Sequence, residues 1–421
     1  MGDGLDGDAV ADLLRGWGAA VRRAADGAEA ERVRVPGVMA VDEWTAETAG
    51  HVRRARGAGA SLMSFGEVIL DALPLPVIAV TGSAGKTSTC HLIASVLRAR
   101  GDTVAMGEAR AANAWPDHTL LDGRADGADV VVAELTSTHL AYMSGWSGPD
   151  LGVLTALWPD HLELHGSLTA YEDAKATLLD RADRVVVPMG CDLGERRGAR
   201  WPVAAEFTVG GPVDGCGAWI VDGRVHCRTG RDRPADVIDQ DAVPEWAHPQ
   251  AVAAAAATGM AWGVTPRDIA AGLRSVVPPP HRMAEVGRRS GRVLVDDSAC
   301  ATPGKLIAAL RRCPADATVL VVGGMRGIDG REVHAAPAER AALREAVQVA
   351  NRSARLVVPF GEAAALLGGL DRAVEPQPDI AAAVATAWAA SQPGDTILVS
   401  PMFPVSQEER REVPRLLLQG G

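Results

Sequence analysis

The sequence predicts an α/β protein of three domains, in which a central doubly wound, mostly parallel sheet is followed by a Rossmann-like α/β domain. Apolar runs of five to seven residues alternate with helical segments in two successive series, and such runs are typical of parallel strands buried on both faces. Consecutive prolines at 278–280 separate the two series, because proline fits neither a helix interior nor a central strand. A length of 421 residues leaves room for two or three domains.

Residues 1–73 are predicted to form a reduced N-terminal domain. Segments 9–25 and 46–60 have the apolar spacing of helices, and a short strand is expected around 34–38. This region has no glycine-rich dinucleotide fingerprint.

The predicted central domain covers residues 74–277. Strands are expected at 76–80, 129–135, 151–157 and 184–189, and a helix at 86–100. Gly101 ends that helix. From about 190 to 245 the pattern weakens into a predicted hairpin excursion of short strands, GAWIVDGRVHCR, which turns at Asp222-Gly223. An alanine-rich helix starting near Ala251 completes the domain.

The predicted C-terminal domain covers residues 278–421. Strands are expected at 292–297, 318–324, 355–361 and 396–401. The last of these is predicted to continue towards the C-terminus, through the stretch TILVSPMFPVSQEERRE. Helices are expected at 304–312, 339–351 and 380–391. Strands and helices alternate here as they do in the central domain, which is why a second α/β domain is predicted.

Composition favours small soluble partners. The formal net charge of −11 argues against nucleic acid and anionic lipid, since either partner would need a basic face. No apolar run approaches the ~20 residues of a membrane helix, and the first residues are acidic where a secretory signal is basic. Six scattered cysteines without a C-x-x-C pair fit a reduced, cytoplasmic location. Nothing in the sequence indicates the oligomeric state.

Residues 81–87 read TGSAGKT and join a predicted strand to a predicted helix. Small residues at a helix N-terminus allow backbone N–H groups to point at a phosphate. Lys86 is expected to reach the terminal phosphates, and the Thr87 hydroxyl a Mg²⁺ ion. The central domain is therefore predicted to be a P-loop domain. The same nucleotide site is expected to include Gly82, Ser83, Gly85 and Ser88.

Three further side chains are predicted to reach this loop. Glu134 ends one expected strand and His161 follows another, and the carboxyl ends of parallel strands form the edge at which such sheets bind ligands. Carboxylate and imidazole are common metal ligands. Lys175 lies on a following helix, in a chain where only 3 of 42 basic residues are lysine. A lysine retained here indicates a need for a primary amine.

These stretches resemble a known family. TGSAGKTST, AELTS and PDHLELHGSLTAYEDAK are similar in order and spacing to the central domain of the Mur ligases. PPPHRMAEVGRRSGRVLVDDSACATPGKLIAAL and VVGGMRGID resemble the MurD-type branch, which adds glutamate to UDP-N-acetylmuramoyl-L-alanine. The resemblance covers about residues 75–420 and implies a ligase that uses ATP to activate a carboxylic acid as an acyl phosphate, which an amino acid or other amine then captures. It also implies that the domain of residues 1–73 binds part of the acyl substrate and that the domain of residues 278–421 receives the amine substrate.

The resemblance also implies roles for individual residues. Thr87 and Glu134 would hold one Mg²⁺ ion and His161 a second. Lys175 matches a lysine that is carbamylated in the family and then ligates metal. The catalytic set is accordingly Lys86, His161 and Lys175. Arg282 and Asp297 match nucleotide contacts from the third domain, and the implied substrate-binding residues are Asn113, Thr136, Arg326 and Ser400.

Several positions depart from the family pattern. The short N-terminal region lacks the glycine-rich turn that binds UDP, Ala84 replaces an asparagine of the loop, and Pro249 and Val252 replace two asparagines near the adenine. We therefore interpret the chain as a specialised ligase of natural-product type. The alternatives are the housekeeping muramoyl-alanine:glutamate ligase, a non-catalytic ATP-binding subunit of an amidotransferase, and a P-loop switch or motor, for which no arginine finger is recognisable.

Overall fold

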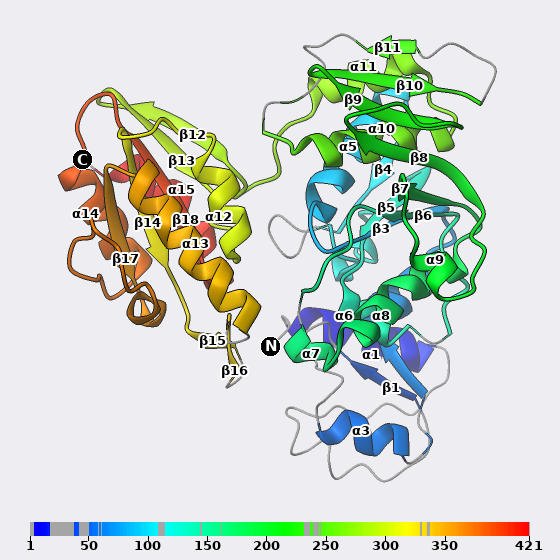
Figure 1. Cartoon of the computed structure of the whole chain (residues 1–421). Helices are drawn as coiled ribbons and strands as arrows, with labels where there is room; N and C mark the ends of the chain where they lie inside the picture. The colour runs from blue at the N-terminus through cyan, green and yellow to red at the C-terminus, as the bar shows by residue number, and fades with distance from the viewer. Residues whose placement is uncertain are drawn as a thin grey trace. The chain divides into compact units, whose positions relative to one another are not determined.

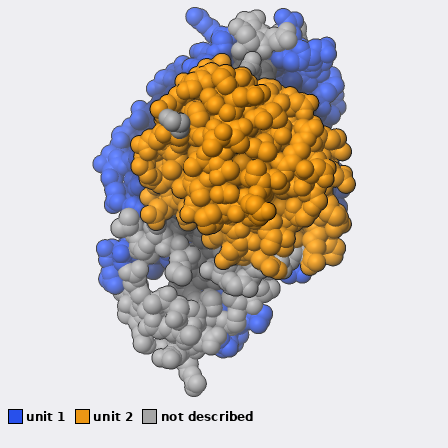
Figure 2. Space-filling model, turned by 90° about the vertical axis from the view of Figure 1, so that its left-hand side faces the viewer, with its two compact units in different colours: residues 1–277 blue, residues 278–421 orange. Residues whose placement is uncertain are grey.

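The computed structural model divides into two compact units, residues 1–277 and 278–421, which are described separately (Figures 1 and 2). The division falls at the proline-rich segment. A separate domain of residues 1–73 stays a prediction. The structure describes residues 4–16, 38–41, 50–57, 59, 61–107, 114–143, 145–160, 162–230, 236–238, 244, 246–328, 331–334 and 337–420.

A nine-stranded sheet, counted over the described residues, forms the centre of the first unit, in the order β11-β10-β9-β8-β7-β6-β3-β5-β4. All pairings from β4 to β9 are parallel, and the two pairings of β10 are antiparallel. Its strands are β3 (Val77–Thr81), β4 (Val104–Ala105), β5 (Val130–Glu134), β6 (Leu151–Leu154), β7 (Val185–Pro188), β8 (Val203–Val209), β9 (Gly217–Val221), β10 (Arg224–Arg228) and β11 (Asp236–Ile238).

Helices cover both faces of this sheet, because successive residues of each central strand are apolar and therefore make both faces apolar. Ile78 and Val80 of β3 pack in one core with helices α5 (Lys86–Arg100), α10 (Pro249–Ala261) and α11 (Pro266–Ser275). Val77 and Ala79 point into a second core on the opposite face. The other helices between residues 118 and 196 are η1 (His118–Leu120), α6 (Ser137–Ala141), α7 (Leu162–His165), α8 (Leu168–Arg181) and α9 (Leu193–Arg196).

The N-terminal segment contributes to that second core through Val10 and Val68. Its elements are α1 (Gly4–Gly16), β1 (Val38–Val41), α3 (Gly50–Gly57), β2 (Ser61–Ser64) and α4 (Phe65–Asp71), and β1 pairs in parallel with β2. The predicted helix 9–25 is seen as far as Gly16, and its remainder lies outside the described residues. Residues 34–37 of the expected strand lie outside them too.

The hairpin at 217–228 is confirmed, and both turn residues, Asp222 and Gly223, have the positive φ of a type I′ turn. It is not a separate excursion, as the sequence had suggested, because β9 pairs in parallel with β8 and so extends the main sheet. Strand β8 was not predicted. Its alternate residues Glu206 and Thr208 are polar and only partly buried, so it lacks the continuous apolar run of the central strands.

The second unit contains a five-stranded sheet in the order β12-β13-β18-β14-β17, with β12 the antiparallel edge strand. Its strands are β12 (Ala284–Arg289), β13 (Arg292–Asp296), β14 (Thr318–Gly323), β17 (Leu356–Phe360) and β18 (Thr396–Met402), with a small pair β15 (Gly327–Ile328) and β16 (Arg331–Glu332) outside it. Its helices are α12 (Pro303–Leu310), α13 (Pro337–Ser353), η3 (Glu362–Leu366), α14 (Ile380–Ala390) and α15 (Gln407–Gln419).

Helix α15 corrects the prediction that the last strand continues towards the C-terminus. Strand β18 ends at Met402, and α15 begins after Ser406. The Ser406 side chain accepts from the Glu409 backbone N–H, and the Glu409 side chain accepts from Ser406, which is a capping box. The predicted α/β fold class with parallel-dominated sheets is confirmed. None of the described helices is long and apolar enough to cross a membrane.

Packing of α11 on α5 depends on a glycine, which gives a prediction for stability. A Cβ atom on Gly272 would lie 2.5 Å from Val96 Cα and 2.7 Å from its backbone nitrogen, so the helices could not stay this close. We expect Gly272→Ala to lower the free energy of unfolding by about 1–3 kcal/mol, the usual cost of overpacking, in urea denaturation followed by circular dichroism. Gly304→Ala is the control, because no atom lies within 4 Å of that position. An unchanged midpoint for Gly272→Ala would contradict the packing argument.

Candidate active site

The phosphate loop between β3 and α5 requires glycine at two positions. Gly82 has φ of 149°, and a Cβ there would lie 2.0 Å from Thr155 Oγ1. Gly85 has φ of 82° and directly precedes Lys86, the first residue of α5. Non-glycine residues rarely adopt these angles. The loop amides therefore stand at the N-terminus of a 15-residue helix, where an anion is favoured.

Neighbouring elements hold this loop by hydrogen bonds to its backbone. Thr155, which follows β6, donates from Oγ1 to the Ala84 carbonyl at 2.6 Å. Gln250, in the first turn of α10, donates from Nε2 to the Thr155 carbonyl at 2.9 Å. The Ser83 N–H donates to the Ala156 carbonyl at 2.9 Å. The sequence analysis did not identify Thr155 or Gln250, since a bond to a backbone carbonyl leaves no motif.

Two of the chain's three lysines meet at one oxygen atom of this loop. Lys86 Nζ lies 3.0 Å from the Gly82 carbonyl, and Lys175 Nζ, from α8, lies 2.9 Å from the same oxygen. Lys175 is 1% exposed. Burial lowers the pKa of Lys175 well below its usual value, and the charge of Lys86 lowers it further, while Asp160 and Glu134 oppose both effects. The lowered pKa increases the neutral fraction of this amine.

Thr87 and Glu134 form a buried pair beside the lysines. The Thr87 hydroxyl donates to Glu134 Oε2 at 2.5 Å, and both residues are 3% exposed. A hydroxyl and a carboxylate are the oxygen ligands that Mg²⁺ prefers. A buried carboxylate also needs a compensating positive charge. The pair therefore fits a divalent cation at the phosphate loop.

Tyr171 is a further member of the cluster that the sequence analysis missed. It lies one helical turn before Lys175 on α8, is fully buried, and places its hydroxyl 2.7 Å from Ser83 Oγ. Burial raises the pKa of Tyr171 and Asp160 adds to this, so its hydroxyl keeps its proton. Lys175 Nζ lies 4.6 Å from the centre of the Tyr171 ring, a cation–π distance. The i, i+4 spacing in YEDAK was the available signal.

The first unit thus brings Ser83, Lys86, Thr87, Glu134 and Lys175 together, along with Gly82 and Gly85. His161 and Asn113 lie outside the described residues, so their predicted roles stay predictions. Ser88 is partly buried in the first turn of α5.

Thr136 has a local structural role in addition to the predicted substrate role. Its Oγ1 accepts from the His139 N–H at 3.1 Å and so caps the N-terminus of α6. The substrate contact predicted for Thr136 stays a prediction.

In the second unit, Asp297 and Ser400 lie in contact. Ser400, on β18, donates from Oγ to Asp297 Oδ2 at 2.7 Å, and the Met283 N–H donates to Oδ1 at 3.1 Å. Burial raises the pKa of Asp297 to about 6, although these bonds and the charge of Arg282 act in the opposite direction. Arg282 and Asp297 are thus electrostatic neighbours.

Arg326, another predicted substrate residue of this unit, lies in an exposed turn after β14.

His281 anchors the beginning of this unit. Its Nδ1 lies 2.7 Å from Asp296 Oδ2, and both side chains are buried. His281 has φ of 61°, an unusual angle for a non-glycine residue. The pair therefore fixes the backbone immediately before Arg282.

Two protein-family models match the chain. The Mur ligase middle domain matches residues 80–196, and the Mur ligase glutamate ligase domain matches residues 281–403. The chain belongs to the Mur ligase family. Mur ligases are ATP-dependent ligases that form C–N bonds, so the predicted enzyme class is confirmed, as is the predicted family.

Curated relatives agree with this family. A UDP-N-acetylmuramoylalanine–D-glutamate ligase of Symbiobacterium thermophilum is 28% identical over 358 residues, which cover 83% of this Mur ligase and 75% of the relative. The protein of the same name from Aromatoleum aromaticum is 32% identical over 347 residues, covering 77% and 68%.

Solved structures agree on the fold. The MurF ligase of Thermotoga maritima, determined in complex with ADP, superposes with a TM-score of 0.60 at 18% identity and covers 93% of this Mur ligase and 97% of that chain. At this identity the likeness shows the shared multi-domain α/β fold.

The raised pKa of Asp297 gives a prediction for the pH dependence of stability. A carboxyl whose pKa is higher in the folded chain than the ordinary 3.8 binds its proton more tightly when folded, so stability falls as pH rises from about 4 to about 6. In the wild type, Asp297 should lower the free energy of unfolding by roughly 3 kcal/mol over this pH range, and we expect Asp297→Asn to lack this decrease. Urea unfolding of the full chain at several pH values measures it, with the exposed Asp371→Asn as control. Parallel pH profiles for Asp297→Asn and the wild type would refute the assignment.

Proposed function

We propose that this Mur ligase joins an amino acid to a carboxylic acid through an acyl phosphate. The observation that carries the proposal is the convergence of Lys86, Thr87, Glu134 and Lys175 on the phosphate loop. A non-catalytic ATP-binding subunit would gain nothing from burying Lys175, because a buried ammonium costs free energy.

Thr87 and Glu134 would hold one Mg²⁺ ion, and His161 a second. When bound, these ions would neutralise the negative charge where the triphosphate and the acid approach each other. Lys175 would supply a further ligand as a carbamate. Its neutral amine would attack the carbon of CO₂, a C–N bond would form, and one proton would be released, so that a neutral amine becomes an anionic carbamate. The lowered pKa of Lys175 supports this step, since only the neutral amine reacts.

In the reaction, an oxygen of the acid would attack the γ-phosphorus of ATP, and ADP would leave. The amine would then attack the acyl carbon through a tetrahedral intermediate, and phosphate would leave. Lys86 would stabilise the negative charge of the transferring phosphoryl group. Arg282 and Asp297 would contribute nucleotide contacts, and Asn113, Thr136, Arg326 and Ser400 substrate contacts. The requirement for ATP favours a cytoplasmic location.

The names of the relatives favour UDP-N-acetylmuramoylalanine as the acid and D-glutamate as the amine. We therefore place this housekeeping reaction first. A specialised reaction of natural-product type is the second candidate, because the 73 residues before the central domain lack the glycine-rich turn expected for a UDP group.

The purified chain should release ADP and phosphate only when both an acid and an amine are present with ATP and Mg²⁺. UDP-N-acetylmuramoylalanine with D-glutamate is the first pair to test, followed by pools of simple acids and amino acids, with adducts identified by mass spectrometry. ADP release without any acid would instead indicate a switch or motor. No release under any condition would indicate a binding module.

Lys175→Arg tests the carbamate. We expect this variant to lose at least about a thousandfold in turnover, and added bicarbonate should not restore activity, because a guanidinium cannot form the carbamate and stays charged. Lys305→Arg is the matched control, since Lys305 is exposed on α12, and it should keep wild-type turnover. Activity retained by Lys175→Arg would disprove the carbamate role.

A further inference from the structure

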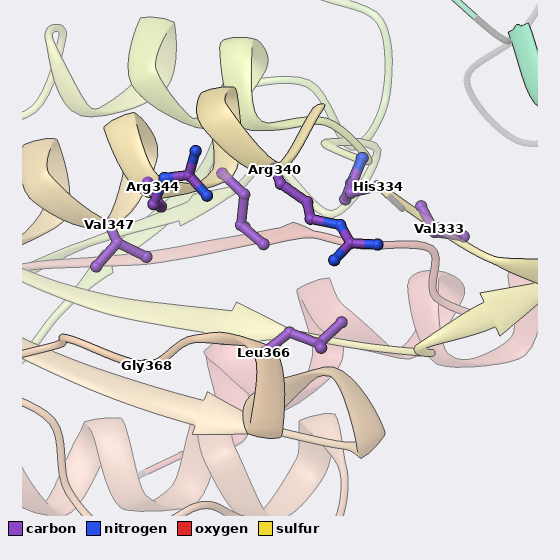
Figure 3. A pocket seen from close by; sticks show the side chains of 8 residues that line it. Val333, His334, Arg340, Arg344, Val347, Leu366 and Gly368 are labelled. Carbon is purple, nitrogen blue, oxygen red and sulfur yellow. The ribbon is translucent and has the colours of Figure 1, made fainter. Parts of the chain in front are cut away.

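His165 is a buried histidine of the first unit that takes no part in the proposed function. It is 5% exposed and is the last residue of the one-turn helix α7. A pocket of about 210 Å³ in the second unit, where Arg340 extends between His334 and Leu366 (Figure 3), lies in the domain that would receive the amine. His165 lies instead in the first unit, where its ring packs on Tyr171 of the phosphate-loop cluster.

His165 contacts two helices that border the phosphate loop. Its Nε2 lies 2.9 Å from Oγ of Ser137, the first residue of α6, and Ser137 is 3% exposed. Its ring packs edge-on against Tyr171 of α8, with the ring centres 5.5 Å apart. Tyr171 in turn contacts Ser83 and Lys175. A buried polar side chain requires a hydrogen-bond partner, so the contact between His165 and Ser137 fixes the end of α7 to the start of α6.

The two helices that this hydrogen bond joins follow the proposed metal ligands in the sequence. Helix α6 begins three residues after Glu134, and α7 begins at the residue directly after His161. The bond therefore links the segment proposed to ligate one ion with the segment proposed to ligate the other. Helix α7 has four residues and ends at Gly166, whose φ is 80°. A helix this short is not stable by itself, so contacts with its neighbours must fix its position.

We propose that His165 is a positioning residue for the second Mg²⁺ site. Its hydrogen bond to Ser137 holds α7 in place relative to α6, and this sets the metal affinity of the site to which His161 contributes. Residues that orient a metal ligand affect metal affinity without touching the ion. The inference rests on the proposed function, in which Glu134 and His161 belong to different ions. The ion at Thr87 and Glu134 should not depend on His165, because these two side chains already hydrogen-bond to each other.

Two substitutions of His165 separate its hydrogen bond from the packing of its ring. His165→Phe keeps an aromatic ring beside Tyr171 but has no nitrogen atom for Ser137. His165→Gln loses the ring but keeps an amide, which can donate to or accept from the Ser137 hydroxyl. Ser137→Ala removes the partner instead. We expect His165→Phe and Ser137→Ala to have the same defect, the double variant to have no larger one, and His165→Gln to behave like the wild type.

Titration of the full chain with Mn²⁺ measures metal binding without turnover, using one equivalent of a non-hydrolysable ATP analogue and the electron paramagnetic resonance signal of free Mn²⁺. The wild type should bind two Mn²⁺ ions, since Mn²⁺ accepts the ligands of Mg²⁺. We expect His165→Phe and Ser137→Ala to weaken one ion at least about tenfold and to leave the other unchanged. His161→Ala should show the same selective loss. His226→Phe is the matched control, because that imidazole stacks on Trp219 of the β9–β10 hairpin, and it should bind both ions like the wild type.

Unchanged Mn²⁺ binding by His165→Phe and Ser137→Ala would overturn the proposal. Equal weakening of both ions would overturn it too and would assign His165 a general structural role, as would a loss in His165→Gln as large as in His165→Phe. Turnover separates this proposal from the proposed function. Ligase activity in the wild type, with both ions unaffected in the variants, would overturn the positioning role alone. Selective loss of one ion in the variants, without wild-type ligase activity for any pair of acid and amine, would overturn the proposed function and leave the positioning role in place.

Discussion

The organisation of the first unit depends on the burial of the Lys175 amine against a backbone carbonyl. Lys175 reaches Gly82 from a different helix than Lys86, and the two amines share one oxygen atom. Such an arrangement is costly unless negative charge lies near, and Glu134 and Asp160 supply it. Helix α8 and strands β3 and β5 must therefore keep a fixed relation. The same constraint makes the site responsive to any change of charge on the amine.

Rigidity of the loop follows from contacts that do not involve charge. Ser83, Thr155 and Gln250 form hydrogen bonds that connect the loop to the end of β6 and to the first turn of α10. Tyr171 adds a bond from α8. Elements on both faces of the sheet thus position the loop amides. The loop is held in place before any anion arrives, which reduces the cost of ordering it on binding.

Much of this organisation could be predicted from the sequence, for physical reasons. Strands such as β3 and β5 are buried on both faces, so they appear as continuous apolar runs, and glycine at 82 and 85 marks a turn that few other residues can make. Strand β8 was not predicted because one of its faces, which carries Glu206 and Thr208, is polar and only partly buried. Helix α15 was not predicted because it contains a proline, Pro414, and many charged residues, which obscure the helical pattern of its sequence. Hydrogen bonds to backbone carbonyls leave no sequence signal at all.

The scarcity of lysine gives the molecule an unusual chemical simplicity. Of its three lysines, Lys175 is sequestered and Lys86 is half-buried at the same carbonyl, while Lys305 stands on the exposed side of α12. Reagents that acylate amines would accordingly modify one surface side chain far faster than any other. Apart from the α-amino group, a fluorophore or tether would therefore be attached chiefly at that one side chain of the unmutated chain, distant in sequence from the phosphate loop.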